Sequence, residues 1–277
     1  MKKILVPTDF STPATEAFAF ALDLSRITGM EIVVVHAVNL PVVAAGFDVQ
    51  PYVYTPELND ELLSIAQESF EKMKLHHPSA IKSTLEIRFN SVLDAILDVM
   101  SKIPIELIVM GTNGANGMKE ILWGSNTERV VRFSPVPVIA VRNAPDIASV
   151  RNIIFPSDLE LGQGDLVERV KDLQSFFNAK LHLLWVNTPG HFVPDPVIHE
   201  KMKEFVNHYH LSNFTLIIRN DTNVESGVAS YLHDSKADLV AMGTHGRKGL
   251  NHLFSGSVAE DVVNHIQCPV WTYSTHK

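Results

Sequence analysis

Short, continuous runs of apolar residues alternate with longer stretches of helical periodicity along the whole chain. The runs are rich in Val and Ile, which is typical of strands buried on both faces of a parallel sheet. Helical patterns extend over Ser11 to Thr28, Pro56 to His76, Val92 to Ser101 and Asn126 to Phe133. The first begins at a Ser-Thr-Pro start and stops at Gly29, a typical helix end. The pattern predicts the order β-α-β-α-β-α-β-α-β in each half of the chain.

Strands and helices in this order predict an α/β fold. Right-handed crossovers give a five-stranded parallel sheet with helices on both faces. The 277 residues are enough for two such domains of about 100–150 residues each. A short Pro/Ala/Ser segment near Pro145 to Val150 marks the expected boundary. We therefore expect one domain over residues 1–146 (the first half) and another over residues 150–277 (the second half).

The two halves repeat one glycine frame. Gly111-Thr-Asn-Gly114 is followed after nine residues by Gly124-Ser125, and Gly243-Thr-His-Gly246 is followed at the same spacing by Gly256-Ser257. Each copy comes after an apolar run and before a helical pattern. A glycine-bearing loop between a strand and a helix can wrap backbone N–H groups around a phosphate. The repeat therefore predicts two ligand-binding loops of the same construction.

The first half carries extra residues between its second and third strands. The offset between matching positions is 149 at Asp9 and Asp158 but 131 at Leu85 and Leu216, a difference of 18 residues. The insertion falls around Leu40 to Pro56, where three prolines and a glycine rule out a continuous helix. This segment is interpreted as a cover over a ligand cleft, a contact with a partner subunit, or a packed loop.

The predicted site chemistry suits a nucleotide. Ligands of open parallel sheets bind beyond the carboxyl ends of the strands, where strand order reverses. Asp9 and Asp158 come at that edge and can accept hydrogen bonds from ribose hydroxyls. The loop residues expected to face phosphates are Gly114, Gly117, Gly124 and Ser125 in the first copy and Gly246, Gly249, Gly256 and Ser257 in the second, where His245, Arg247 and Lys248 add cationic donors. The spacing differs from both the dinucleotide fingerprint and the Walker loop.

Charge and composition exclude several other classes. The net charge is −8 and there is no basic block, which argues against nucleic-acid binding. No run approaches the ~20 apolar residues of a membrane span, and the N-terminal apolar run is too short for a signal-peptide core. Cys268 is the single cysteine and cannot form an internal disulfide. We expect a cytoplasmic protein without membrane association, with Cys268 as a buried apolar position.

The residue pattern gives little support for a metal site or a catalytic nucleophile. His76 and His77 are adjacent, and His208 and His210 are two apart, so each pair diverges on a helix and predicts no zinc site. Ser125 lacks the elbow of a hydrolase nucleophile. We expect no catalytic residue and no metal ligand, with slow ATP hydrolysis as the most chemistry that the chain performs.

These motifs resemble the universal stress protein family in its tandem two-domain form. The resemblance covers nearly the whole chain and rests on Pro-Thr-Asp-Phe-Ser at 7–11, Met-Gly-Thr-x-Gly at 110–114 and Met-Gly-Thr-His-Gly-Arg at 242–247. It implies a doubly wound fold of the adenine-nucleotide alpha-hydrolase-like class, with strand order 3-2-1-4-5. Many members bind ATP, and others do not. The family pairs through its last strand, which tandem halves can do internally as a pseudo-dimer, alongside a homodimer as a further possibility.

The resemblance also implies individual contacts. Adenine and ribose contacts are implied at Pro7, Thr8, Asp9, Ala37, Met110 and Gly111, and phosphate contacts at Gly114, Gly124, Ser125, Asn126 and Thr127. The expected site also includes Ser11 and Gly117, and in the second half Asp158, Val186, Met242, Gly243, Gly246, Arg247, Gly256, Ser257 and Val258.

The second half departs from the family pattern at Glu160, which stands where the first half has Ser11. A carboxylate near a phosphate repels it by ~1 kcal/mol in water at close range. The first half departs where Asn113 and Ala115 replace His and Arg. Two function classes stay open. One is an ATP-binding regulatory protein, with Mg²⁺ assistance and an unidentified protein partner, and the other is a scaffold of the same fold that binds no nucleotide.

Overall fold

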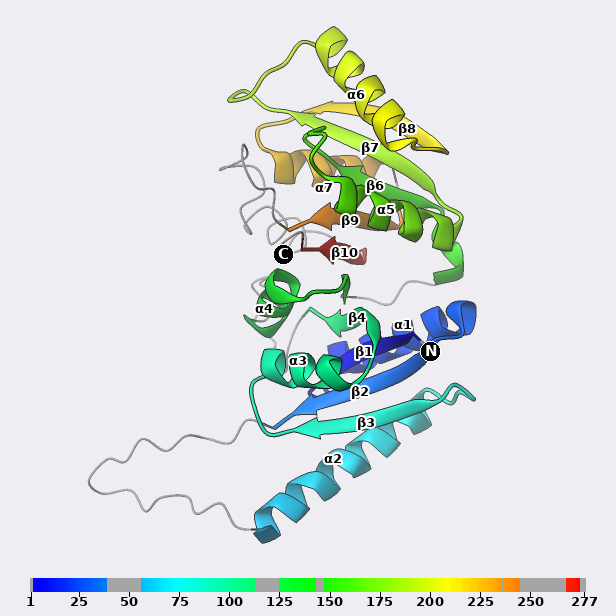
Figure 1. Ribbon diagram of the computed structural model, residues 1–277, viewed down its shortest axis with the longest axis vertical. Helices are drawn as coiled ribbons and strands as arrows, with labels where there is room; N and C mark the ends of the chain where they lie inside the picture. The colour runs from blue at the N-terminus through cyan, green and yellow to red at the C-terminus, as the bar shows by residue number, and fades with distance from the viewer. Residues whose placement is uncertain are drawn as a thin grey trace, which may run out of the picture.

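The computed structural model describes residues 2–38, 56–112, 125–142, 147–235, 237–244 and 268–274. Within these residues the strands form a 10-stranded sheet in the order β3-β2-β1-β4-β5-β10-β9-β6-β7-β8 (Figure 1). Counted inside each half, the order is 3-2-1-4-5, which confirms the expected doubly wound fold. All neighbouring strands within a half run parallel.

The elements follow the predicted alternation. The first half contains β1 (Lys3–Thr8), α1 (Thr12–Thr28), β2 (Glu31–Ala37), α2 (Pro56–His76), β3 (Ser83–Arg88), α3 (Val92–Lys102), β4 (Ile105–Gly111), α4 (Ser125–Phe133) and β5 (Val138–Val141). A 3-10 turn, Ile147–Ser149, precedes the second half. The second half contains β6 (Asn152–Pro156), α5 (Gly164–Phe177), β7 (Lys180–Asn187), α6 (Asp195–Tyr209), β8 (Phe214–Asn220), α7 (Val224–Ser235), β9 (Leu239–Gly243) and β10 (Val270–Tyr273). The helix expected from residue 258 lies outside the described residues.

The halves share fine backbone detail as well as element order. α1 ends at Gly29 with φ +70° and α5 ends at Asn178 with φ +48°, 149 positions later, so both helices close on a left-handed residue. Phe10 and Leu159, again 149 apart, have φ values of +60° and +63° after the first strand of each half. Non-glycine residues seldom adopt this conformation. Its recurrence at matching positions means that the same tight turn follows β1 and β6.

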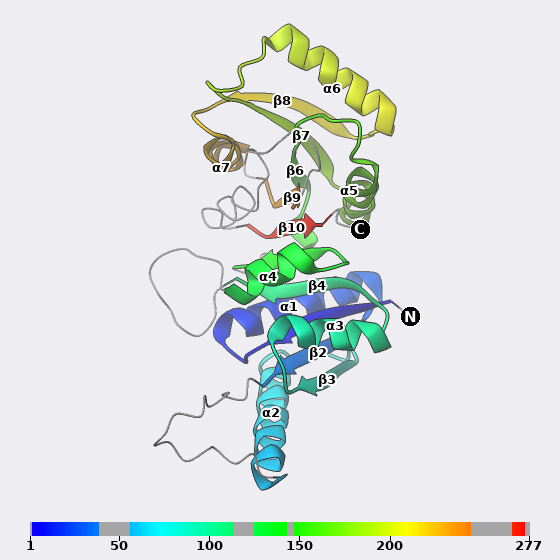
Figure 2. The same ribbon diagram turned by 60° about the vertical axis from the view of Figure 1, so that its left-hand side comes forward.

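Helices cover both faces of the sheet (Figures 1 and 2). One apolar cluster joins the sheet to α1, α2, α5 and α6, and a second joins it to α3, α4 and α7. Each cluster crosses the junction between the halves, because Ile139 and Trp271 belong to the first cluster and Val138 and Val270 to the second. The core is therefore shared by the two halves on both faces.

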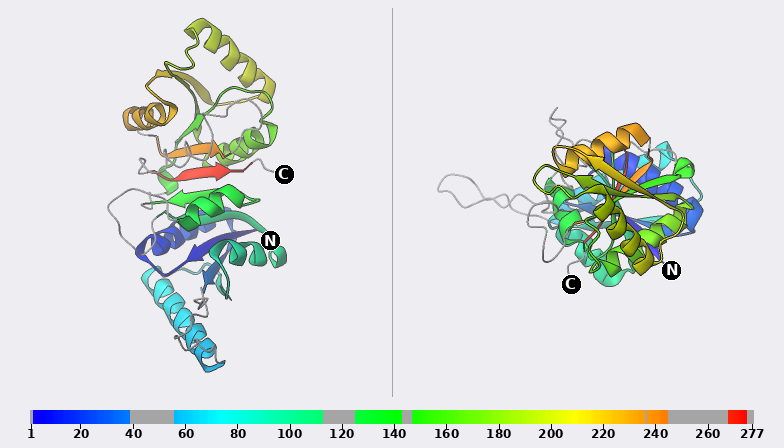
Figure 3. Two further views of the ribbon diagram at one scale, coloured as in Figure 1. Left: turned by 90° about the vertical axis from the view of Figure 1, so that its left-hand side faces the viewer. Right: turned by 90° about the horizontal axis from the view of Figure 1, so that it is seen from above.

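The halves join through their last strands. β5 and β10 pair antiparallel, with Trp271 opposite Ile139 and Thr272 opposite Val138 (Figure 3). The Thr272 hydroxyl also donates to the Val138 carbonyl oxygen at 3.3 Å. The expected internal pairing is thus present. Because β5 and β10 run antiparallel, the strands of the two halves point in opposite directions. The carboxyl ends of the first-half strands therefore lie on one side of the sheet, and those of the second-half strands lie on the opposite side.

The extra length of the first half is spread over more than one element. Residues 39–55, which hold most of the segment expected to differ, lie outside the described residues. The helix that follows is longer than its counterpart, because α2 has 21 residues and α6 has 15. α2 projects beyond β3 at one end of the molecule (Figure 2).

Candidate functional site

A cavity of about 110 Å³ lies at the carboxyl ends of β1, β2 and β4 in the first half. Its lining includes these residues expected from the sequence: Pro7, Thr8, Asp9, Ser11, Ala37, Met110, Gly111, Asn126 and Thr127. Ala14, Val35, Val92 and Ala95 complete the lining and were not anticipated. The structure therefore brings the predicted base and ribose positions together at one edge of the sheet.

The turn after β1 orients the polar side chains of this cavity. The Thr8 hydroxyl accepts a hydrogen bond from the Phe10 N–H at 2.9 Å, and Asp9 Oδ1 accepts one from the Ser11 N–H at 3.0 Å. These two bonds hold Phe10 in its left-handed conformation and fix the Asp9 carboxylate at the cavity wall. Ser11 Oγ is buried and has no hydrogen-bond partner in the part of the chain that the structure describes.

A buried hydroxyl without a partner is costly, because its lost hydration is not replaced. Ser11 precedes α1 at the N-cap position, yet its side chain caps no N–H of the helix. Ser11 lines the cavity, so a rotation about its Cα–Cβ bond would present this hydroxyl to a polar ligand atom there. This is the feature of the first-half cavity that points most directly to a ligand.

The close approach of α1 to β4 explains the glycine at the end of β4. A Cβ atom added at Gly111 would lie 2.6 Å from the backbone carbon and oxygen of Pro13. The Thr127 hydroxyl donates to the Gly111 carbonyl oxygen at 3.1 Å and is buried, so the first turn of α4 is fixed to the same strand end. The Thr127 hydroxyl is thereby used within the protein, whereas Ser125 and Asn126 at the start of α4 are exposed. Gly114, Gly117 and Gly124 lie outside the described residues.

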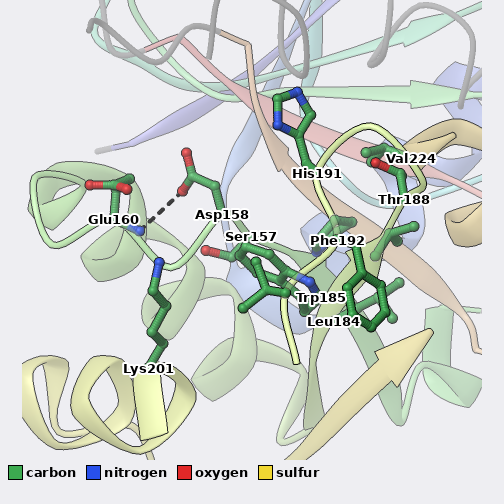
Figure 4. A pocket seen from close by; sticks show the side chains of 13 residues that line it. Ser157, Asp158, Glu160, Leu184, Trp185, Thr188, His191, Phe192, Lys201 and Val224 are labelled. Atoms are coloured by element: carbon green, nitrogen blue, oxygen red, sulfur yellow. Dashed lines mark hydrogen bonds between the residues drawn. The ribbon is translucent and has the colours of Figure 1, made fainter. Parts of the chain in front are cut away.

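A larger cavity of about 330 Å³ lies at the carboxyl ends of β6 and β7 in the second half (Figure 4). Its walls include Asp158 and Val186, which the sequence predicted, together with Glu160. Met242 is fully buried within β9 and Gly243 ends that strand, and neither lines the cavity that the described residues form. The remaining predicted positions, Gly246, Arg247, Gly256, Ser257 and Val258, lie outside the described residues.

The turn after β6 repeats the first-half turn but uses its carboxylate differently. The Ser157 hydroxyl accepts from the Leu159 N–H at 3.0 Å, and Asp158 Oδ1 accepts from the Glu160 N–H at 3.2 Å. Asp158 Oδ1 also accepts a hydrogen bond from the side-chain amide of Gln163. Burial raises the pKa of Asp158 above its ordinary value, against the opposing effect of these hydrogen bonds. The second-half carboxylate is therefore already bonded from within the protein.

Tyr209 holds the Gln163 backbone in place. The Tyr209 hydroxyl accepts from the Gln163 N–H at 3.0 Å and donates to the Leu161 carbonyl oxygen. Gln163 stands 149 positions after Ala14, so the first half has only a methyl group at the place from which this amide reaches the carboxylate. Sequence reasoning missed Gln163. The spacing of 149 residues between the two halves identifies Ala14 as the counterpart of Gln163. The replacement of an alanine by a glutamine does not by itself indicate that the glutamine bonds to Asp158.

A second exchange between the halves concerns packing. Val186 and Gly227 occupy the places of Ala37 and Ala95, at offsets of 149 and 132. A Cβ atom at Gly227 would lie 2.4 Å from Val186 Cγ1, so the larger strand residue is accommodated only because the helix residue lacks a side chain. In the first half both alanines line the cavity. The strand end and the helix therefore meet through two methyl groups in the first half and through a valine against a glycine in the second.

Two further structural observations bear on function. Within the described ranges, no three His, Cys, Asp or Glu side chains come together in a way that could hold a metal ion. None of the helices in the described part of the chain has the length and apolarity that crossing a membrane requires.

A model of the universal stress protein family matches residues 1–142 and 215–274, more than half of the chain. This chain belongs to the universal stress protein family. The match includes the first-half cavity and the β8 to β10 part of the second half, so both copies of the repeat contribute to it.

Individual relatives support the tandem form of this universal stress protein. One from Methanocaldococcus jannaschii is 32% identical over 148 residues, which cover 51% of this chain and 82% of the relative. One from Synechocystis is 22% identical over an alignment of 293 residues that covers 99% of this chain and 100% of the relative. The crystal structure of a universal stress protein from Archaeoglobus fulgidus has a TM-score of 0.74 at 21% identity, covering 99% of this chain and 98% of that one. The tandem arrangement is therefore shared with the Archaeoglobus structure and matched along its whole length by the Synechocystis relative, whereas the Methanocaldococcus relative matches about half of this chain.

Proposed function

We propose that this universal stress protein is an ATP-binding regulatory protein whose nucleotide site is the first-half cavity. The observation that carries the proposal is the buried, unpartnered Ser11 hydroxyl in a cavity that also presents the Asp9 carboxylate. A volume of about 110 Å³ accommodates a ring system rather than a whole nucleotide. The base therefore occupies the cavity beside Ala37, Ala95 and Met110, and the rest of the nucleotide extends toward α4.

Each part of the site has a task in this proposal. The Asp9 carboxylate is fixed by the Ser11 N–H and accepts hydrogen bonds from the ribose hydroxyls. The exposed start of α4, with Ser125 and Asn126, meets the phosphates and their Mg²⁺, since unpaired N–H groups and the helix dipole favour anions there. Occupancy then ties α4 to the end of β4 more firmly and changes the surface that a partner protein meets. Catalysis is little or absent in this scheme.

Carboxylate removal provides a test with an internal control. Asp9→Asn keeps an acceptor for the Ser11 N–H but removes the charge, so ATP affinity should fall by about tenfold, equivalent to about 1.4 kcal/mol. Asp158→Asn makes the same change at the matching position of the second half, where Gln163 already engages the carboxylate. Titration calorimetry of both variants should show a loss for Asp9→Asn only. Equal affinities in the two variants would reject the assignment of the ribose contact.

Two further measurements test the site as a whole. Denaturing the purified protein and analysing the released small molecules by mass spectrometry should detect ATP, ADP or AMP. Gly124→Val should abolish ATP binding, because a branched side chain restricts the backbone and blocks its approach to phosphate. If no nucleotide is released and the wild-type protein shows no heat with ATP, the alternative applies, and the protein acts as a scaffold through protein contacts alone.

A further inference from the structure

The second-half cavity differs from the first-half cavity in size, in lining and in charge. Its volume of about 330 Å³ falls within the range of about 300–1,000 Å³ typical of small-molecule sites. It is bounded by the turn after β6, the end of β7, the segment from Thr188 to Val193, Lys201 of α6 and Val224 at the start of α7 (Figure 4). The first-half cavity has no wall from α2 among the described residues. The second-half cavity therefore shares the strand-end positions of the first-half cavity and adds walls, from residues 188–193 and from Lys201, that the described lining of the first-half cavity lacks.

An aromatic wall is held in place on one side of this cavity. Trp185 and Phe192 both line it, and Phe192 is 68% exposed. The segment that carries Phe192 is well ordered by hydrogen bonds: the Asn187 side chain accepts from the Val193 N–H and donates to the Val193 carbonyl oxygen, each at 2.9 Å. The His191 N–H donates to the Thr188 carbonyl oxygen at 3.0 Å. A large apolar ring kept at the mouth of a cavity by a fixed turn is suited to stacking against a planar ligand.

The opposite wall is acidic. Asp158 and Glu160 lie together on the turn after β6, and Lys201 reaches toward them from α6 (Figure 4). The Lys201 ammonium also lies 6.0 Å from the centre of the Trp185 ring. The described lining holds two carboxyl groups, the Lys201 ammonium and His191. Its carboxylates repel a phosphate placed beside them and offer acceptors to hydroxyl and amino groups. The Glu160 N–H and the Gln163 amide both donate to Asp158 Oδ1, so Asp158 Oδ2 and the exposed Glu160 carboxylate are the acceptors that this wall offers to a ligand.

We propose that the second-half cavity binds an uncharged, ring-bearing ligand of nucleoside size, stacked on Trp185 and Phe192 and hydrogen-bonded to Glu160, and that it discriminates against the phosphorylated form. The site is independent of the ATP site proposed for the first half. One chain would then sense two ligands that differ in charge, with Ser11 and Glu160, at the matching positions, setting the difference.

Adenosine and ATP are the probes that test this site. In a Gly124→Val background, adenosine should bind at least tenfold more tightly than ATP by calorimetry. Phe192→Ser should weaken adenosine binding by about tenfold, because it removes the exposed ring of the aromatic wall. Val197→Ser is the matched control, since Val197 is 48% exposed on α6 and lies outside the cavity lining. Both changes are at exposed positions, and equal urea midpoints will show that both variants are folded.

Glu160→Ser gives a second, charge-specific readout. The substitution should lower the ratio of the ATP dissociation constant to the adenosine dissociation constant. This effect should be larger at low salt, where the repulsion between the Glu160 carboxylate and the phosphates is least screened. The proposal fails if the Gly124→Val protein binds no adenosine, if it binds ATP as tightly as adenosine, or if Phe192→Ser and Glu160→Ser change nothing. ATP binding by the wild-type protein reports on the first-half site separately, so either site can fail alone.

Discussion

Replacing Gly227 with alanine tests how closely α7 approaches β7. The added Cβ atom would lie 2.4 Å from Val186 Cγ1 and 2.8 Å from Val186 Cγ2, well inside van der Waals contact. Overpacking of this kind costs about 1–3 kcal/mol. Alanine regains about 0.5–1 kcal/mol over glycine inside a helix. The net loss should therefore lie between about 0 and 2.5 kcal/mol, most of it seen as a lower urea midpoint with an unchanged slope.

A double-mutant cycle separates the clash from the helix effect. In a Val186→Ala background the clash is gone, so Gly227→Ala should stabilise the protein rather than destabilise it. Gly164→Ala, at the first residue of α5, is the control for adding a Cβ atom without a clash, because a Cβ atom there would meet nothing within 4 Å. The reasoning is refuted if Gly227→Ala alone raises the urea midpoint as Gly164→Ala does, since Val186 would then not occupy the space of the missing side chain.

Three other changes have defined outcomes. Burial raises the pKa of Asp158 above about 3.9, the pKa of an aspartate in an unfolded chain. Ionisation of this carboxyl group therefore lowers the stability of the folded protein as the pH rises above that value. Asp158→Asn removes the ionisable group, so it should raise the melting temperature at pH 7 more than at pH 4. Cys268 is partly buried, and this burial raises the pKa of its thiol to about 12, so iodoacetamide at pH 8 should label it far more slowly in the folded protein than in urea; equal labelling rates would contradict the raised pKa. Gly111→Ala should destabilise by about 1–3 kcal/mol and Gly243→Ala by less, measured by urea titration, because the first meets the Pro13 backbone and the second a flexible Leu166 tip.

Local sequence patterns predicted the elements with small errors. α2 was predicted over Pro56 to His76 and is found there, because its apolar positions repeat at helical spacing and a proline opens it. The helix predicted from Val92 to Ser101 extends one residue further, to Lys102, which is an ordinary uncertainty at a helix end. The parallel sheet also followed from the alternation of strands and helices, since connections of that length require crossovers.

Features that depend on contacts between distant residues were not predictable in the same way. The left-handed conformation of Phe10 and Leu159 has no glycine to announce it, because side-chain hydrogen bonds from the preceding Thr8 and Ser157 stabilise it instead. The bond from Gln163 to Asp158 depends on Tyr209, which lies 46 positions further along the chain. The repeat pointed to equivalent carboxylates in the two halves, each of which accepts a backbone N–H two residues later, and only the three-dimensional structure reveals that Asp158 also accepts a side-chain amide.

The antiparallel join of β5 and β10 has a genetic and a physical consequence. In a homodimer of single-domain chains, one gene encodes both sites, so a substitution to glutamine or glutamate changes both sites at once. A covalent pair escapes that constraint, and Gln163 and Glu160 can arise on one side while Ala14 and Ser11 persist on the other. The pairing is also intramolecular, so its strength does not fall when the protein is diluted. The two proposed sites, at opposite ends of the strands of one sheet, are therefore present in a fixed one-to-one ratio at any concentration of the protein.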